Sequence, residues 1–169
     1  ICTTGALYSA TANINVDGGV MITASHNPPE YNGFKMCRGT AAMAGDEIQA
    51  LRAVFETGNF RSGDGSHIDA GDFLSTYMSD VIENAGLPAR TVKVSIDCAN
   101  AVPGPFMIEL CNKLGCDTHA LHCEWDNTFP NHPPDPTRPK NMVELGAKVV
   151  ETGAEFGIGI DGDGDRVGV

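Results

Sequence analysis

The sequence predicts an α/β fold, with mixed, largely parallel sheets flanked by helices. Alternating or apolar runs typical of strands occur at residues 92–97 and 155–160, the context suggests a further strand at 117–122, and helical patterns lie between them. An alternation of strands and helices favours parallel pairing, with ligands bound at the carboxyl ends of the strands. We therefore expect functional residues in the loops that follow strands.

The first part of the chain is expected to contribute half of an α/β unit. Its predicted elements are a helix at 4–15, a buried strand at 19–23, a second strand at 34–37 and an amphipathic helix at 46–56. The polar, glycine-rich run at 57–71 is the best candidate for a linker.

The second part repeats a strand-helix pattern. Its predicted elements are helices at 70–84, 105–114 and 140–152 and strands at 92–97, 117–122 and 155–160. Five prolines between residues 127 and 139 predict an irregular loop.

The composition is acidic, and this limits the class of partner. The 169 residues include 11 Lys or Arg and 22 Asp or Glu, for a net charge of −11. A nucleic-acid or anionic-membrane surface is not expected, and the absence of a long apolar run or signal-like segment predicts a soluble, cytoplasmic protein. Positive charge for an anionic ligand must be local, and Lys35, Arg38 and Arg166 are the candidates.

Six scattered cysteines without a Cys-x-x-Cys pair predict reduced, mostly buried thiols. A zinc site from Cys116, His119, His122 and Cys123 is not expected. In a strand, alternation would send His119 and Cys123 to one face and the other two residues to the opposite face.

The stretch Thr23-Ala24-Ser25-His26-Asn27-Pro28-Pro29 follows an apolar run and precedes Lys35. A serine on a loop beyond a strand is held by rigid backbone yet open to a ligand, as a nucleophile or phosphate carrier requires. The sequence has no Gly-x-Ser-x-Gly elbow here and no local Ser-His-carboxylate relay. A phosphate-carrying serine would need a cation site elsewhere.

The end of the chain offers that cation site. Asp161, Asp163 and Asp165 alternate with glycines after an apolar run, and such oxygen ligands suit Mg²⁺, Mn²⁺ or Ca²⁺. An EF-hand is excluded because Arg166 occupies the sixth loop position, where glycine is required. Taken alone, the stretch is equally consistent with an acidic turn, but Arg166 beside it is suited to clamp a phosphate.

Together these motifs resemble the α-D-phosphohexomutase family, most closely its phosphomannomutase/phosphoglucomutase branch. The resemblance rests on residues 23–28, 31–35, 129–132 and 161–166. It implies parts of two consecutive domains: residues 1–68 as the C-terminal part of the first, phosphoserine domain, and residues 69–169 as the second, metal-loop domain. It also implies that the family's later domains lie outside this chain.

The resemblance further implies an intramolecular phosphotransferase of the isomerase class, acting on mannose or glucose phosphates. Ser25 would carry the phosphoryl group, and a hexose 1,6-bisphosphate would be the intermediate and activator. The implied Mg²⁺ ligands are Ser25, Asp161, Asp163 and Asp165. The implied catalytic residues are Ser25, Lys35, His26 and Arg166, and the implied substrate-binding residues are Arg166, Lys35 and Asn27.

Lys35 would act as general acid/base, for which we expect neighbouring positive charge to lower its pKa.

The sequence departs from the family's usual motifs at two places, one in a side chain and one in a backbone turn. Pro133 stands where relatives often carry a second histidine, and Ala99 and Ala101 stand where a glycine-rich turn is common. Because alanine resists positive φ, we expect an adjusted turn there.

The residues themselves are also consistent with two other classes of function. A metal-dependent phosphohydrolase could use the same serine and acidic loop, and a non-catalytic binding or structural segment could contain both. The sequence predicts no oligomeric state.

Overall fold

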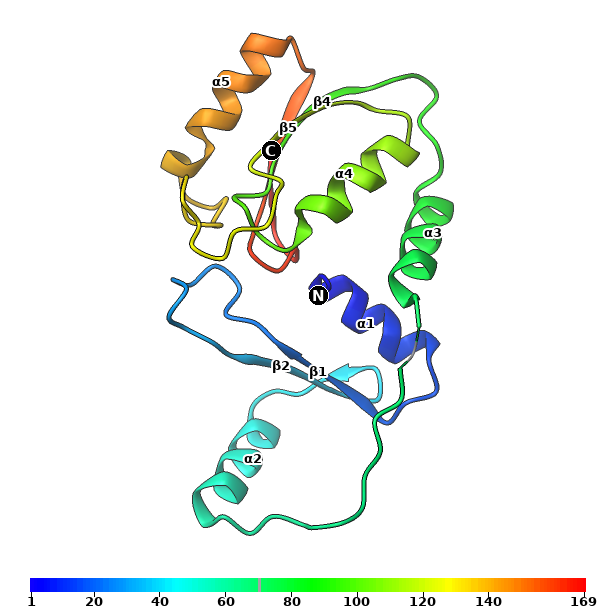
Figure 1. Cartoon of the computed structure of the whole chain (residues 1–169), viewed down its shortest axis with the longest axis vertical. Helices are drawn as coiled ribbons and strands as arrows, with labels where there is room; N and C mark the ends of the chain where they lie inside the picture. Colours follow the sequence, from blue (N-terminus) through cyan, green and yellow to red (C-terminus); the bar gives the residue numbers. More distant parts are fainter. Residues whose placement is uncertain (70) are drawn as a thin grey trace.

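The computed structural model describes residues 1–69 and 71–169 and confirms the α/β class (Figure 1). The first part of the chain consists of α1 (Thr4–Asn13), β1 (Gly18–Ile22), β2 (Phe34–Arg38), β3 (Ala41–Ala42) and α2 (Asp46–Thr57). The strands form an antiparallel sheet in the order β1-β2-β3. The two longer strands and both helices were predicted, whereas the two-residue β3 was not.

Helix α1 covers one face of this sheet. Gly19 of β1 permits the close approach, because a β-carbon there would lie 2.8 Å from side-chain atoms of both Leu7 and Thr11. The opposite face is open: Val20 and Ile22 are 63% and 65% exposed, and helix α2 has no buried residue. The prediction of a buried first strand was therefore wrong, because only one side of β1 is covered in the described chain.

The second part of the chain contains a four-stranded sheet with helices on both faces (Figure 1). Its elements are α3 (Phe73–Ala85), β4 (Lys93–Asp97), α4 (Pro103–Lys113), β5 (Asp117–Leu121), the 3₁₀ helix η1 (Pro139–Met142), α5 (Val143–Thr152), β6 (Phe156–Ile160) and β7 (Val167–Gly168). Strands β5, β4 and β6 are parallel, as predicted, and β7 adds antiparallel to β6. The predicted helix start at Ala70 lies outside the described residues.

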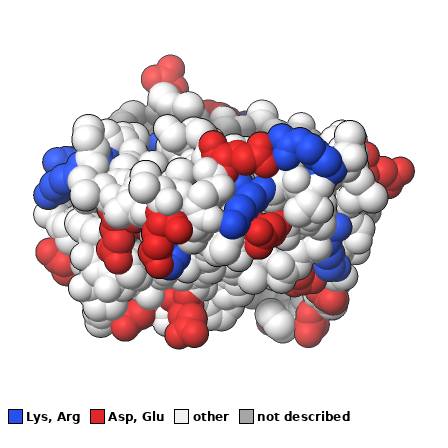
Figure 2. All heavy atoms as spheres, turned by 90° about the horizontal axis from the view of Figure 1, so that it is seen from above, with Lys and Arg blue, Asp and Glu red and all other residues white. Residues whose placement is uncertain are grey.

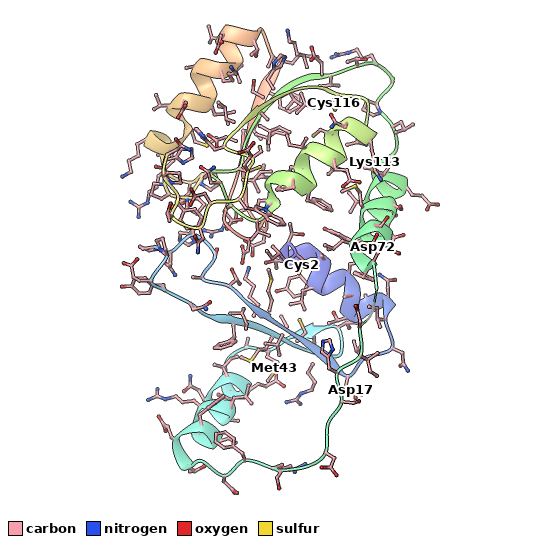
Figure 3. All side chains as sticks on the ribbon, in the orientation of Figure 1. Cys2, Asp17, Met43, Asp72, Lys113 and Cys116 are labelled. Carbon is pink, nitrogen blue, oxygen red and sulfur yellow. The ribbon has the colours of Figure 1, made fainter. Side chains whose placement is uncertain are left out.

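The core of the second part lies between this sheet and α4. It comprises Val94, Ile96, Cys98, Cys111 and Ile160. All six cysteines are free thiols, from Cys2 near the N-terminus to Cys123 after β5. Figure 3 labels two of them, Cys2 and Cys116. Burial is the main cause that raises the pKa of Cys111 to about 11, which keeps that thiol protonated at neutral pH.

Two turns at the carboxyl ends of β4 and β5 differ from the predictions. Ala99 has φ +47° and Asn100 has φ +60°, so the alanine occupies the left-handed region that it was expected to avoid. Hydrogen bonds hold the turn: Ala99 N–H donates to Asp97 Oδ1, and Asn100 N–H donates to the His122 carbonyl. His122 itself has φ +47°, which ends strand β5 one residue earlier than predicted.

The predicted helix at 140–152 is also divided. Its first turn is the 3₁₀ helix η1, and the α-helix begins only at Val143. Asn141 fixes this first turn, because its side-chain amide donates to the carbonyls of Pro133 and Asp135 in the proline-rich loop. Competition from these loop contacts explains the tighter start.

The two sheets meet where the loop after β1 lies against the loop after β6 (Figure 1). A β-carbon on Gly162 would lie 1.8 Å from the Ser25 carbonyl oxygen, so only glycine fits between these backbones. Thr4 N–H, at the start of α1, donates to the Asp163 carbonyl at 2.8 Å. The division into domains at residue 68 remains a prediction.

The distribution of surface charge agrees with the acidic composition. Figure 2 shows acidic and basic side chains interspersed over one face, without a continuous basic patch on it. No helix among the described residues has the length and apolar character needed to cross a membrane.

Candidate functional site

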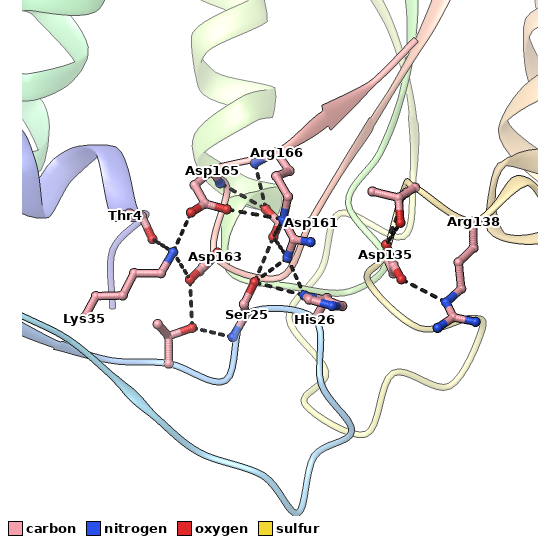
Figure 4. Close-up of polar contacts among 12 residues, drawn as sticks. Thr4, Ser25, His26, Lys35, Asp135, Arg138, Asp161, Asp163, Asp165 and Arg166 are labelled. Atoms are coloured by element: carbon pink, nitrogen blue, oxygen red, sulfur yellow. Dashed lines mark hydrogen bonds and ion pairs between the residues drawn. The ribbon is translucent and has the colours of Figure 1, made fainter. Parts of the chain in front are cut away.

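Ser25 lies on the loop after β1 and faces the loop after β6 (Figure 4). Its Oγ donates a hydrogen bond to Asp161 Oδ2 at 3.0 Å, across 136 positions of sequence. Its φ of +55° is unusual for a residue with a side chain. The backbone N–H of Ser25 donates to Thr23 Oγ1 at 2.9 Å, which helps to hold this conformation.

The acidic loop Asp161–Asp165 follows β6 directly. Asp161 and Asp163 are buried, Asp165 is exposed, and one carboxylate oxygen from each lies within 4.8 Å of the others. The cost of burying the Asp161 carboxylate is offset by the backbone N–H groups of Asp165 and Arg166, which donate to its Oδ1. The strand end and the short glycine-rich loop thus bring three carboxylates together.

The acidic loop fits a divalent cation with a preference for oxygen. Asp163 Oδ1 is buried and has no hydrogen-bond partner among the described residues, which is costly for a charged group. Its second oxygen, Oδ2, accepts from Thr23 and pairs with Lys35. Ser25 Oγ, beside Asp161, adds a fourth oxygen to the same place. Such a set of carboxylate and hydroxyl oxygens suits Mg²⁺.

Arg166 joins the serine loop to the acidic loop. Its Nη2 donates to Asp161 Oδ2 at 2.7 Å and also contacts Ser25 Oγ and His26 Nδ1 (Figure 4). Partial burial alone would lower the pKa of Arg166, but the charges of Asp161, Asp165 and Asp135, together with the hydrogen bonds to Asp161, outweigh it and raise that pKa. A fixed guanidinium and an imidazole therefore lie beside the serine oxygen.

Lys35, on β2, reaches the same loops from the other side. Its Nζ lies 2.8 Å from Asp163 Oδ2, 2.5 Å from Asp165 Oδ2 and 3.1 Å from Thr4 Oγ1. Desolvation would lower the pKa of Lys35, but the hydrogen bonds and charges of the two aspartates outweigh it and raise that pKa. The predicted lowering was wrong, because the nearest charges are carboxylates rather than cations.

Known protein families match the chain along most of its length. The sequence model for phosphoglucomutase/phosphomannomutase, alpha/beta/alpha domain II matches residues 75–169, and that for domain I matches residues 1–62. The chain belongs to the phosphoglucomutase/phosphomannomutase family. This agrees with the resemblance seen in the motifs.

The relatives of this chain within the family are much longer than it. A phosphomannomutase/phosphoglucomutase of Pseudomonas aeruginosa is 43% identical over 166 residues, covering 98% of this chain and 35% of the relative. A phosphoglucomutase of Neisseria meningitidis is 42% identical, and the match covers 98% of this chain and 36% of the relative. The crystal structure of a phosphoglucomutase/phosphomannomutase family protein from Burkholderia thailandensis superposes with a TM-score of 0.93 at 37% identity. The match covers 99% of this chain and 38% of that protein. The chain thus spans about a third of the length of these proteins.

Two residues predicted for the site in this family member are not joined to it. Asn27 is exposed in the turn after Ser25, where its backbone N–H donates to the Ala24 carbonyl. Arg38 is 71% exposed and pairs with Glu47 of α2 at 2.8 Å. The role of Asn27 in substrate binding remains a prediction, while Arg38 is engaged elsewhere.

Two threonines in the site were missed by the sequence analysis. Thr23 donates to Asp163 Oδ2 at 3.0 Å, and Thr4 accepts from Lys35. The position of Thr23 two residues before Ser25 was a usable signal, since threonine hydroxyls commonly bond to backbone two residues on. Thr4 carries no such signal, because it reaches the site only through the packing of α1.

Proposed function

We propose that the protein containing this chain is a phosphosugar mutase that moves a phosphoryl group between O1 and O6 of a hexose. The observation that supports this most directly is the hydrogen bond of Ser25 to Asp161, which joins a serine loop and an acidic loop from distant parts of the sequence. Membership of the phosphoglucomutase/phosphomannomutase family supports the same reaction class.

In this proposal Ser25 carries the phosphoryl group at rest. Asp161, Asp163 and Asp165, with an oxygen on Ser25, would hold Mg²⁺, and Asp163 Oδ1, which has no partner among the described residues, is an available ligand atom. When bound, Mg²⁺ would offset the carboxylate charge and stabilise the negative charge on the transferring phosphoryl oxygens.

The remaining charge on the phosphoryl group would be met by Arg166 and His26, whose side chains contact each other beside Ser25 Oγ. A guanidinium fixed by Asp161 needs little reorganisation when charge shifts between oxygens. In the first transfer, the bond from phosphorus to Ser25 Oγ breaks as a bond from phosphorus to a sugar oxygen forms.

Lys35 would accept the proton of the attacking sugar hydroxyl and return one in the reverse transfer. This requires its neutral form, which the uncompensated aspartates disfavour by raising its pKa. A cation bound by the same aspartates would weaken that effect. The hexose 1,6-bisphosphate formed in the first transfer would turn over and return its other phosphate to Ser25.

We propose mannose and glucose phosphates as the substrates, by analogy with the names of the relatives above. The whole reaction is assigned to the longer protein, because this chain matches about a third of its relatives. The chain alone would accept a phosphoryl group at Ser25 but would interconvert sugar phosphates weakly or not at all.

The test is phosphorylation of the chain by a hexose 1,6-bisphosphate in the presence of Mg²⁺, followed by intact-mass measurement and peptide mapping. One phosphate on the peptide that contains Ser25 is expected, with none in Ser25→Ala and one in Ser62→Ala, a matched exposed serine. The longer protein should interconvert hexose 1- and 6-phosphates. If the longer protein remains unphosphorylated at Ser25, the proposal is wrong, and release of free phosphate without isomerisation would indicate a phosphohydrolase.

A further inference from the structure

A second cluster of metal-ligating side chains lies at the carboxyl ends of β4 and β5. Asp97 is the last residue of β4 and pairs in register with Leu121, the last residue of β5. His122 follows Leu121, so parallel pairing brings Asp97 and His122 to the same edge of the sheet. His132 arrives there from the proline-rich loop.

The three side chains are close together and mostly buried. His132 Nε2 lies 2.9 Å from Asp97 Oδ2, and the rings of His132 and His122 have centroids 5.6 Å apart. One ligand atom from each residue lies within 4.8 Å of the other two. The Asp97 side chain is only 2% exposed, so its charge must be neutralised locally.

The hydrogen bonds of His132 leave its Nε2 facing an acceptor. The Nδ1 of His132 lies 3.0 Å from the Pro133 carbonyl, which only accepts, so Nδ1 carries a proton. Nε2 and Asp97 Oδ2 then need either a second proton or a cation between them. Histidines that bind a metal through one ring nitrogen commonly donate the N–H of the other nitrogen to a backbone carbonyl.

His122 also has a nitrogen that the protein leaves unsatisfied. Its Nε2 is buried without a hydrogen bond among the described residues, although Glu144 Oε2 of α5 lies 3.1 Å away. Glu144 is 56% exposed, so its side chain has room to move. A cavity of about 10 Å³, near the smallest size that accepts one water molecule, adjoins Asp97 and His132 but is not lined by His122 or Glu144.

We propose that Asp97, His122 and His132 form a second metal site that binds Zn²⁺, with Glu144 as the fourth ligand. Two imidazole nitrogens and two carboxylate oxygens suit Zn²⁺ in a tetrahedral site, whereas Mg²⁺ prefers oxygen ligands alone. Ligand atoms about 3.4 Å apart are expected around a tetrahedral zinc with bonds of about 2.0–2.1 Å, so small side-chain movements would admit the ion.

This site would differ in role from the acidic loop. Its ligands come from β4, the end of β5, the proline-rich loop and α5, so a bound ion would tie the loop to the sheet. The proposal does not depend on phosphoryl transfer at Ser25. It uses a histidine from the Cys116–Cys123 stretch, but with partners from elsewhere in the chain.

The test is Zn²⁺ binding to the chain in excess Mg²⁺, which is added to compete with Zn²⁺ for the acidic loop. We expect one Zn²⁺ per chain by calorimetry, and at least tenfold weaker binding in His122→Gln and in His132→Gln. The matched control is His119→Gln on β5, whose Nε2 is also buried without a hydrogen bond among the described residues but lies beside Asp117, outside the cluster. Circular dichroism verifies the fold of each variant.

Cobalt serves as the spectroscopic probe of the ligands. The Co²⁺-loaded chain should show the intense visible bands of a four-coordinate site, without the near-ultraviolet sulfur-to-cobalt band that cysteine ligands produce. Zinc affinity unchanged in both histidine variants, a sulfur-to-cobalt band, or no zinc bound in excess Mg²⁺ would each overturn the proposal.

Discussion

Thr23 Oγ1 donates a hydrogen bond to Asp163 Oδ2 at 3.0 Å and at the same time accepts the Ser25 N–H at 2.9 Å. One hydroxyl thereby links the acidic loop to the backbone of the serine loop. Because Ser25 has a positive φ, its conformation depends on such contacts. Thr23 is therefore a positioning residue for the proposed site.

Replacement of Thr23 by valine should slow phosphorylation of Ser25 by about tenfold or more. The change keeps the shape but leaves the Ser25 N–H without its acceptor, and an unsatisfied group of this kind costs about 1–3 kcal/mol. The measurement is the rate of phosphate incorporation from a hexose 1,6-bisphosphate. Thr23→Ser retains the hydroxyl and should react near the rate of the unchanged chain; equal rates for all three would argue against the role of Thr23.

Replacement of Gly162 by alanine should separate the two loops. The added methyl group would lie 1.8 Å from the Ser25 carbonyl oxygen, so one backbone must move. We expect the free energy of unfolding to fall by about 1–3 kcal/mol and Mg²⁺ binding to weaken. Denaturant unfolding and calorimetry measure these two effects.

Gly146 provides the matched control for Gly162. It lies in α5, and a β-carbon added there would meet no neighbouring atom within 4 Å, so alanine fits. Gly146→Ala should stabilise the chain by about 0.5–1 kcal/mol and leave Mg²⁺ binding unchanged. If the two substitutions have the same effect, the close approach at Gly162 is not what holds the loops together.

The sequence was sufficient to predict what depends on local pattern. Strand β4 follows from its alternating pattern, β6 from its apolar run and β5 from its place between two helices, and their parallel order follows from those helices. The positions of Ser25 and Asp161 after strand ends follow from the same patterns. Their contact across 136 positions was implied only by the family resemblance.

Features that depend on tertiary contacts were not predicted. Ala99 takes a positive φ because Asp97 and His122 bind the turn, and no propensity reports those partners. The pKa of Lys35 moves opposite to the expectation because the fold places two aspartates beside it. The open face of β1 was missed because an apolar run does not reveal which side a helix covers.

Mg²⁺ should raise the melting temperature of the chain. A cation that binds the folded acidic loop and not the unfolded chain stabilises the fold by mass action. Substitution of all three loop aspartates, Asp161→Asn, Asp163→Asn and Asp165→Asn, should abolish the increase. Asp64→Asn with Asp69→Asn, in the exposed segment after α2, should retain it, and calorimetric scans with and without Mg²⁺ distinguish the two cases.

An ion pair outside the site allows a test of pH dependence. Arg90 Nη1 and Nη2 each lie 2.6 Å from an oxygen of Glu155, and Lys93 N–H also donates to that carboxylate. The Arg90 hydrogen bonds are the main cause that lowers the pKa of Glu155 from 4.5 to about 2. Since the folded-state pKa is the lower one, the stabilisation is present above about pH 4.5 and is lost as pH falls towards 2.

Carboxyl-carbon NMR of Glu155 measures this pKa directly. Arg90→Gln should return the titration midpoint towards 4.5 and remove the corresponding loss of stability on acidification. Arg52→Gln is the matched control, because Arg52 is an exposed arginine that pairs with Glu56 instead. A Glu155 midpoint that stays low in Arg90→Gln would mean that the Lys93 backbone N–H, rather than the guanidinium, stabilises the carboxylate.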